Sequence, residues 1–333
     1  MLQESAVGRA IVLKFLNKLR GNYLFSLVSS TLLLPVQWLC STLDRQIRMK
    51  VWVNGRKVVY DNVPLKFPQD VGLYISSGVY WNGVQGFEPH TWKTMRHFLE
   101  RVDAFVDVGS NIGFYSVLAS KVNSGLSIDA FEPIPQIYSK NHEFMKENHS
   151  SYELHHAALS DKNGEFEIFL PVRSSGIEEE ATATLREDSW QQRSASKISM
   201  TVKTVTLDEF GLSKYTKGDR VLIKVDVEDF EASVFSGGRA FMRQLRPIVI
   251  CEMLRREHGN QETVNIIEEL DYAIYAVTPA GLFRFSRDDF FKPRPFTDFL
   301  FVPKEQLKGI PNFLSYASLQ NDVQFVSLTK VDG

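Results

Sequence analysis

The sequence contains few cysteines and no residue pattern that typically holds a metal ion. Cys40 and Cys251 are the only two cysteines in 333 residues, and both lie in apolar runs without Cys-x-x-Cys or Cys/His spacing. The seven histidines also lack the spacing of metal ligands. These absences argue against a disulfide framework and a zinc site, and they favour a reducing compartment, so we expect a cytoplasmic protein.

The chain also lacks a strong charge of either sign, and it lacks internal repeats. Its 38 basic and 40 acidic residues leave a formal net charge of −2, which gives no electrostatic footprint for nucleic acid. Apolar residues make up 44% of the chain, enough to bury a large core. We therefore expect one sizeable domain with extensions, and no nucleic-acid partner.

Residues 1–48 are predicted to form a helical extension. Lys14, Lys18 and Arg20 precede an apolar run that Pro35 interrupts. Basic residues ahead of such a run are typical of a helix that contacts a membrane surface, here over residues 11–40. The competing interpretation is a helical pair that packs on the domain or forms a homo-oligomer contact, because the run is short for a span and contains polar residues. We recognise no cleaved export signal.

Local patterns divide the rest of the chain into three further segments. Residues 49–90 are predicted to contain a β-hairpin around Asn54-Gly55 and then a glycine-rich connector. Residues 91–303 alternate between strand and helix patterns and are expected to form the main domain. Within it, residues 171–200 lack periodicity and are predicted to be a flexible loop, either a substrate lid or a solvated insertion. Residues 304–333 are expected to be a C-terminal tail.

The main domain is organised around a strand, a glycine turn and a helix. Residues 104–108 predict a buried strand, Gly109 and Gly113 bound a turn, and residues 114–122 have helical spacing. Gly109 allows a sharp turn, and Gly113 allows the helix to approach the strand closely. A second strand ends at Glu132, whose carboxylate is suited to accept hydrogen bonds from the two hydroxyls of a ribose. The pattern predicts a nucleotide-binding site.

The turn does not have the spacing of a dinucleotide site. A pyrophosphate site needs G-x-G-x-x-G, whereas this sequence has Asn111 in place of the middle glycine. Asp107 stands two residues before the first glycine, where a negative charge repels a phosphate but suits a sulfonium or an amino group. An NAD-dependent oxidoreductase is therefore disfavoured.

Two blocks of the sequence resemble the FkbM family of S-adenosylmethionine-dependent methyltransferases. The first is F-V-D-V-G-S-N-I-G-F-Y-S over residues 105–116. The second joins T-L-D-E-F (residues 206–210), L-I-K-V-D-V-E-D-F-E (222–231) and R-P-I-V-I-C-E (246–252). Asp229 departs from the family pattern, which usually has glycine at this position.

The resemblance implies an α/β fold with a doubly wound, Rossmann-like sheet of seven mostly parallel strands and an antiparallel last strand, in addition to the N-terminal helices and the small β-hairpin. It implies S-adenosyl-L-methionine as the cofactor. It also implies that the segment ending at Glu88 folds over the cofactor end of the sheet, and that small residues around Ala158 border the adenine ring. The expected cofactor-binding residues are Asp107, Gly109, Asn111, Gly113, Glu132, Ala158 and Glu88.

Acidic residues are expected to gather beyond the carboxyl ends of the strands, where open α/β sheets bind their ligands. With Asp107 and Glu132 assigned to the cofactor, Asp226 and Glu228 are the candidate catalytic residues. A hydroxyl is a poor nucleophile, and it profits from a general base or from a metal that lowers its pKa. A divalent metal such as Mg²⁺ would have Asp226 and Glu252 as candidate ligands.

Sequence reasoning thus predicts an S-adenosylmethionine-dependent methyltransferase. The resemblance implies O-methylation of a hydroxyl on a sugar, a glycan or a secondary metabolite, so the partner would be a small-molecule or glycan acceptor. The alternative is a non-catalytic scaffold that keeps the fold and the cofactor. Asp229 favours that alternative, because losing glycine there restricts the backbone and adds a charge.

Overall fold

The computed structural model describes residues 28, 32, 53, 55–68, 71–172, 196–227, 229–254, 260–291, 295–309 and 312–325. Except at positions 28 and 32, the predicted helical extension (residues 1–48) and membrane contact (11–40) lie outside the described residues. Within the described part of the chain, no helix combines the length and the apolar character needed to cross a membrane.

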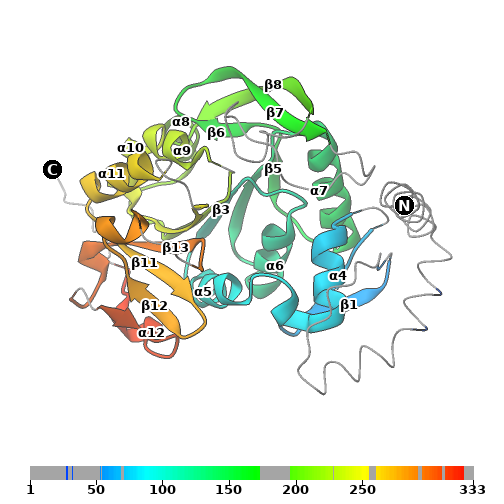
Figure 1. The fold of residues 1–333 in the computed structure, drawn as a ribbon, viewed down its shortest axis with the longest axis horizontal. Coiled ribbons are helices and arrows are strands. Elements are labelled where there is room, and N and C mark those ends of the chain that lie inside the picture. The colour runs from blue at the N-terminus through cyan, green and yellow to red at the C-terminus, as the bar shows by residue number, and fades with distance from the viewer. Residues whose placement is uncertain are drawn as a thin grey trace, which may run out of the picture.

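A nine-stranded sheet forms the centre of the molecule (Figure 1). Its strands, in spatial order, are β14 (Phe313–Leu314), β12 (Gly281–Arg284), β11 (Tyr272–Thr278), β13 (Asp298–Pro303), β10 (Ile248–Glu252), β9 (Val221–Val225), β3 (Ala104–Val108), β4 (Ser127–Phe131) and β5 (Glu153–His155). The strands from β5 to β10 pair in parallel, whereas β13 runs antiparallel to both β10 and β11. β3 is the central one of these five parallel strands and is buried along its whole length.

The predicted fold class is confirmed, and the strand count differs. The seven strands from β5 to β11 form the expected mostly parallel sheet with one reversed strand, β13. Two further strands, β12 and β14, extend this sheet beyond β11. They cover backbone groups of β11 that would otherwise form an open sheet edge. The segment expected to be a C-terminal tail therefore contributes β14 to the central sheet.

Helices cover both faces of the sheet, as doubly wound folds require (Figure 1). One face carries α5 (Pro89–Leu99), α6 (Phe114–Val122) and α7 (Pro135–Glu147), and the other carries α8 (Leu207–Lys214), α9 (Glu231–Ser236), α10 (Arg239–Leu245) and α11 (Gln261–Glu269). A hydrophobic core lies on each face of the sheet. Because side chains alternate along β3, Phe105 packs in the core on the α6 side, whereas Val106 and Val108 pack in the core on the other side. The helix predicted over residues 114–122 coincides with α6.

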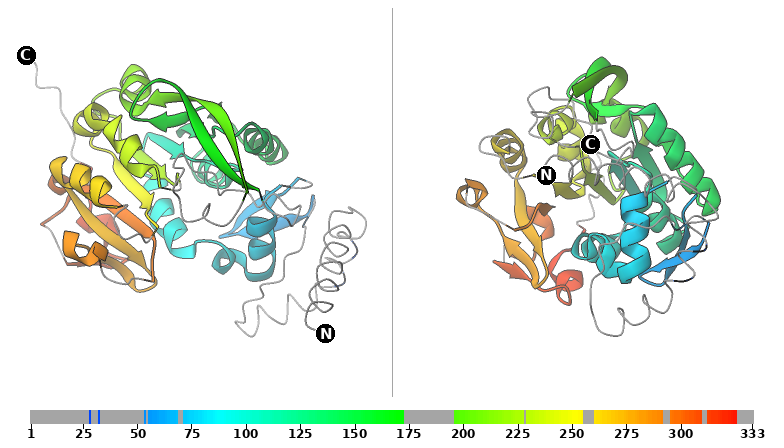
Figure 2. Two further views of the ribbon diagram at one scale, coloured as in Figure 1. Left: turned by 45° about the horizontal axis from the view of Figure 1, so that its top comes forward. Right: turned by 45° about the vertical axis from the view of Figure 1, so that its right-hand side comes forward.

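A second sheet has the order β6-β8-β7 and comprises β6 (Ala158–Ser160), β8 (Ser196–Thr206) and β7 (Gly164–Val172). Figure 2 shows β7 and β8 as a long ribbon beside the central sheet. Their antiparallel register extends to Val172 opposite Ser196, so the ends of the predicted flexible loop (171–200) are strands. Residues 173–195 of that loop lie outside the described residues.

A small β-hairpin that sequence reasoning missed precedes the core, directly after the turn predicted at Asn54-Gly55. β1 (Lys57–Tyr60) pairs with β2 (Val63–Lys66) around Asp61-Asn62, whose φ angles are 47° and 65°. Asp and Asn tolerate this left-handed conformation better than other side chains, and two such residues make the turn that matches strand twist. The amide of Arg56 donates to the carbonyl oxygen of Val53 at 3.0 Å, and Gly55 has a φ of 67°, so the chain also turns where the Asn54-Gly55 turn was predicted. The strand predicted before this turn lies outside the described residues, except for Val53.

The remaining elements are short. The predicted connector contains α4 (Leu73–Asn82) and η1 (Gly83–Gly86), and the later chain contains η3 (Arg287–Phe291), η4 (Lys304–Gln306) and α12 (Leu319–Asp322). Together with the hairpin, the connector brings aromatic side chains against α5 and α6, including Tyr60 and Phe87. The connector therefore belongs to the core on the α5–α6 face.

The turn between β9 and α9 holds a strained residue. Asp229, the departure from the family pattern, has a φ of 80°, in the region that L-residues seldom occupy. A Cβ in this conformation costs about 1–2 kcal/mol. The turn therefore accommodates Asp229 at the expense of backbone strain.

We expect Asp229→Gly to be more stable than Asp229→Ala by about 1 kcal/mol, because both variants remove the carboxylate and only the alanine keeps a Cβ. Urea unfolding of the two variants measures the difference directly. Equal unfolding free energies would show that this turn relaxes to an unstrained conformation.

Candidate active site

Strand alternation places several charged side chains on one face at the carboxyl edge of the central sheet. Asp107, Lys224, Glu252 and Asp298 each lie two residues from a side chain that packs in the core on the α5–α6 side. They therefore project to that same side. The register aligns Asp107 with Lys224 across β3 and β9, and Glu252 with Asp298 across β10 and β13. Residues far apart in the sequence thus form one group.

The glycine turn between β3 and α6 is closely packed. Gly109 and Gly113 have φ angles of 77° and 79°, in the left-handed region. A Cβ on Gly109 would lie 2.0 Å from the carbonyl oxygen of Asp226, and a Cβ on Gly113 would lie 2.3 Å from the hydroxyl oxygen of Tyr152. Only glycine fits at either position. The predicted sharp turn at Gly109 is confirmed, and the close neighbours of Gly113 are side chains.

Asn141 on α7 holds this turn in place through hydrogen bonds. Sequence reasoning did not identify this residue. Its Nδ2 donates to Ser110 Oγ at 3.0 Å and to the carbonyl oxygen of Asn111 at 2.7 Å, while its Oδ1 accepts from the hydroxyl of Tyr152 at 2.5 Å. Asn141 is fully buried. The available signal was an amide side chain on the apolar face of the helix, three residues before the buried Phe144.

Glu132 holds the other end of the turn. Its Oε2 accepts from the backbone amide of Asn111 at 3.1 Å, and its Oε1 accepts from the amide of Ile134 at 2.8 Å. The side chain is 4% exposed. Burial raises the pKa of Glu132 to about 7, although both amide hydrogen bonds favour the ionised form. A carboxylate has about four acceptor positions, so two remain for other donors.

Asp107 is also buried. Its Oδ2 accepts from Ser116 Oγ at 2.6 Å, a bond between the end of β3 and the first turns of α6. Burial raises the pKa of Asp107 to about 6, opposed by the positive charge of Lys224. The charge of Asp107 contributes to the raised pKa of Glu132, so these two predicted cofactor-binding residues lie close together.

Lys224 is the cation around which the acids gather. Its Nζ lies 2.7 Å from Asp226 Oδ2 and 4.9 Å from the centre of the Tyr115 ring. Burial disfavours the ammonium ion, but the charges of Asp226, Glu88 and Asp107 outweigh burial and raise the pKa of Lys224 above its ordinary value. Lys224 is therefore protonated at neutral pH.

Four acids near Lys224 are partly exposed: Glu88, Asp226, Glu252 and Asp298. Burial favours the neutral form of Asp226, but Lys224 and a hydrogen bond with Glu252 hold its pKa below the ordinary value. The charge of Asp226, with burial, raises the pKa of Glu252 to about 11. Burial raises the pKa of Glu88 to about 7 and that of Asp298 to about 6. Asp226 and Glu252 therefore share one proton at neutral pH.

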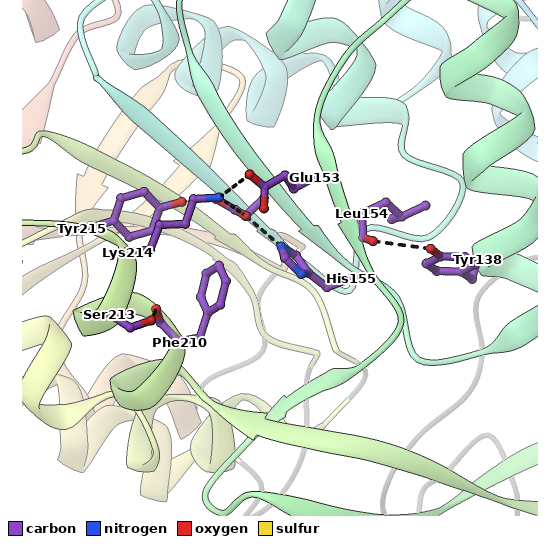
Figure 3. A network of polar contacts seen from close by, with 9 residues as sticks. Tyr138, Glu153, Leu154, His155, Phe210, Ser213, Lys214 and Tyr215 are labelled. Carbon is purple, nitrogen blue, oxygen red and sulfur yellow. Dashed lines mark hydrogen bonds and ion pairs between the residues drawn. The ribbon is translucent and has the colours of Figure 1, made fainter.

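A different group of residues satisfies the geometry of a metal site. Among the described residues, the ligand atoms of Asp129, Glu153 and His155 lie within 4.8 Å of one another. Figure 3 shows that Lys214 reaches into this group, with Nζ 2.7 Å from Asp129 Oδ1 and 3.0 Å from Glu153 Oε1. Tyr215 also donates to Asp129. The lysine ammonium thus supplies the positive charge that these acids need.

The structure brings together most of the predicted site residues. Asp107, Gly109, Asn111, Gly113 and Glu132 form one cluster at the glycine turn. Glu88, predicted to bind the cofactor, lies with the predicted catalytic Asp226 and with Glu252.

Other predicted residues lie elsewhere. Ala158 is buried at the start of β6, and its contact with adenine stays a prediction. Glu228 lies outside the described residues. Sequence reasoning missed Asp298 and Tyr115. The i, i+2 pattern of β13 gives only the face on which Asp298 lies, and the register with β10 places it opposite Glu252.

The chain shows similarity to methyltransferases. The family profile described as methyltransferase FkbM domain matches residues 107–275. A solved methyltransferase FkbM from Methylobacillus flagellatus is 15% identical, with a TM-score of 0.37 over 60% of this chain and 43% of that one, so the match spans less than half of that protein. No curated protein gives a significant match.

Two further solved structures are similar. A precorrin-6y C5,15-methyltransferase from Geobacter metallireducens is 12% identical, with a TM-score of 0.33 over 63% of this chain and 84% of that one. An O-methyltransferase from Bacillus cereus, in complex with SAH, is 10% identical, with a TM-score of 0.33 over 64% of this chain and 78% of that one.

We expect Asn141→Ala to lower the free energy of unfolding by about 2–3 kcal/mol, because it leaves several buried partners without a hydrogen bond. Tyr152→Phe removes one of these bonds and serves as the matched control, with an expected loss of about 1 kcal/mol. Chemical denaturation measures both. Equal losses would mean that the two amide donor bonds contribute nothing to the turn.

The raised pKa of Glu132 has a consequence for stability. A carboxyl group whose pKa rises from 4.5 to about 7 on folding stabilises the protein fully below 4.5, and this contribution is lost as the pH rises through about 7. We therefore expect the unfolding free energy of the wild type to fall, relative to that of Glu132→Gln, as the pH rises through this window. Denaturant titrations at several pH values measure the difference, and a constant difference would contradict the account.

Proposed function

Because the chain belongs to the FkbM methyltransferase family, whose profile matches residues 107–275, we propose that it binds S-adenosyl-L-methionine and methylates a hydroxyl group of a sugar, a glycan or a secondary metabolite. The observation that carries the proposal is that Lys224 lies at the carboxyl edge of the sheet between two groups of acidic side chains. On one side lie the glycine turn, Asp107 and Glu132; on the other lie Glu88, Glu252 and Asp298.

The side with the glycine turn fits the cofactor. Glu132 retains acceptor capacity beyond its two amide bonds, as a ribose with two hydroxyls requires. Asp107 and Glu132 are buried carboxyl groups with raised pKa values, so a ligand carrying positive charge would stabilise their ionised forms. S-adenosyl-L-methionine carries a sulfonium and an amino group, and it supplies a methyl group bound to positively charged sulfur.

The same groups at the glycine turn do not fit a dinucleotide. Asp107 stands two residues before Gly109, where its carboxylate would repel a pyrophosphate bound at the turn. The amide of Asn111, which could bind a phosphate, donates to Glu132. The oxidoreductase interpretation therefore has no support from the geometry.

The other side of the edge suits an uncharged acceptor. Partly exposed carboxyl groups there accept hydrogen bonds from hydroxyls, and a protonated Glu252 can donate one. A phosphate or carboxylate at the reacting end of the acceptor would meet repulsion from Glu88, Asp226 and Asp298. The chain's own part in the transfer is to align the acceptor oxygen with the methyl carbon and to remove its proton.

We expect Asp107→Asn to weaken the binding of S-adenosylhomocysteine about tenfold or more, since a lost charge-assisted hydrogen bond of about 1.5 kcal/mol or more corresponds to that factor. Isothermal titration calorimetry measures the affinity, with NAD as a ligand that should not bind. Asp103→Asn is the matched control, because Asp103 pairs with Arg220 at the opposite end of β3 and is half exposed. Unchanged affinity of Asp107→Asn would remove Asp107 from the site.

A screen then tests the acceptor class. Purified protein is incubated with S-adenosyl-L-methionine and methyl glycosides of common sugars, and products are detected by mass spectrometry. Parallel samples contain magnesium or a chelator, because Asp226 and Glu252 are the candidate metal ligands. Cofactor binding without transfer to any hydroxylated acceptor would favour the scaffold interpretation, and binding of NAD alone would overturn the proposal.

A further inference from the structure

Glu88 occupies an uncommon position at the site. It precedes α5 as the N-cap residue with a φ of 37°, in the left-handed region, and Pro89 follows it as the first helical residue. The side chains preferred at this position, Ser, Thr, Asp and Asn, bond the free amides of the first turn. The Glu88 side chain makes no such bond. Its Oε2 instead accepts from the hydroxyl of Tyr115 at 2.5 Å.

Tyr115 connects Glu88 to the side of the edge that fits the cofactor. It is the second residue of α6, directly after the glycine turn, and its ring lies over Lys224 Nζ. Trp92 and Phe87 pack against the same ring. The tyrosine is therefore fixed on several sides, and it holds Glu88 at the boundary between the cofactor side and the acceptor side.

We propose that Glu88 is the catalytic base that takes the proton of the acceptor hydroxyl, and that Tyr115 is the residue that positions it. This inference rests on the proposed methyl transfer to a hydroxyl. It assigns Glu88 to the acceptor, whereas sequence reasoning assigned it to the cofactor.

The groups that face Glu88 come from six elements or turns. They are Tyr60 on β1, Tyr115 on α6, Lys224 on β9, Asp226 after β9, Glu252 on β10 and Asp298 on β13. Lys224 and the Tyr115 hydroxyl favour the carboxylate form, whereas burial, Asp298 and Asp226 oppose it. The balance leaves Glu88 with a pKa of about 7, suited to accept a proton near neutral pH.

The neighbouring acids are less suited to this role. Asp226 is paired with Lys224 at 2.7 Å, and its lowered pKa makes it a weak base. The charge of Asp226 raises the pKa of Glu252, so Glu252 is protonated at neutral pH and does not accept a further proton. Asp298 lies on β13, separated from β3 by two strands, whereas Tyr115 ties Glu88 to the helix that starts at the glycine turn.

The proton transfer balances without a further reactant. The acceptor oxygen keeps the electron pair of its O–H bond and forms a bond to the methyl carbon, while the electron pair of the carbon–sulfur bond stays on sulfur. The proton goes to Glu88, whose Oε1 is not used by Tyr115. Release of this proton to water after product dissociation restores the carboxylate.

An NMR titration tests the state of Glu88 without an acceptor. The full chain is labelled with carbon-13 at glutamate carboxyl groups, and the Glu88 signal is assigned by its absence in Glu88→Gln. We expect a midpoint of about 7 in the wild type and a higher midpoint in Tyr115→Phe, which loses a bond to the carboxylate. A midpoint near the ordinary 4.5, or one that Tyr115→Phe leaves unchanged, overturns the proposal.

Steady-state kinetics test the role of Glu88 as the catalytic base, with a methyl glycoside that the acceptor screen identifies as a substrate. We expect kcat/KM of the wild type to rise with pH through about 7, since the base must be ionised. Glu88→Gln should lose this rise and lower kcat about 10²–10⁴-fold. Tyr115→Phe should shift the rise to higher pH. Glu100→Gln, after the C-terminal end of α5, is the matched control and should behave as the wild type.

Calorimetry separates this inference from the proposed function. S-adenosylhomocysteine should bind Glu88→Gln with an affinity within about twofold of the wild type. A large loss of affinity would return Glu88 to the cofactor, and a wild-type rate and pH profile in Glu88→Gln would exclude it as the base. Failure of the wild type to bind the cofactor would instead contradict the proposed function, while the NMR titration would still decide the state of Glu88.

Discussion

The candidate active site depends on one buried positive charge. In the described part of the chain, Lys224 is the only cation among the acids at the carboxyl ends of β3, β9 and β10 and at the start of β13. It touches or faces Asp226, Glu88 and Asp107. Several carboxylates cannot be ionised together in a poorly solvated space, so the group distributes protons among its members. The pairing with Lys224 keeps Asp226 charged, which in turn keeps Glu252 neutral and leaves Glu88 near the middle of its titration. The proton affinities of the site thus follow from burial of the carboxyl groups together with the position of a single ammonium group.

Much of the fold was predictable, because it follows from local patterns. The apolar run before Gly109, the helical spacing from Phe114 and the acid after β4 are read from consecutive residues, and the structure confirms them. These statements need only the periodicity of a strand or a helix. The rule that open α/β sheets bind their ligands beyond the carboxyl ends of the strands also predicted that Asp107, Glu132, Asp226 and Glu252 would gather at that edge.

The remainder depends on contacts that no local pattern records. Sequence reasoning found the turn at Asn54-Gly55, a strong local signal, but it missed the hairpin turn at Asp61-Asn62, whose strands bury Val58, Tyr60, Val63 and Leu65. Asn141 and Tyr115 became site residues only when α7 and α6 were packed against the turn. The proton affinity of Glu88 depends on partners up to 210 residues away in the sequence, since Asp298 is one of them. Tertiary packing decides each of these cases.

The order of the strands also bears on when the site comes into existence during folding. β3, β4 and β5 are neighbours in sequence as well as in space, so the glycine turn and Glu132 can assemble through short-range contacts. The opposite side requires β9, β10 and β13 to return across much longer chain segments. Closing a long loop costs conformational entropy before the stabilising contacts form, so such strand pairings form late in folding. A partly folded chain can therefore possess its nucleotide half while it still lacks the residues that would complete the reaction, which links catalytic competence to the last steps of folding.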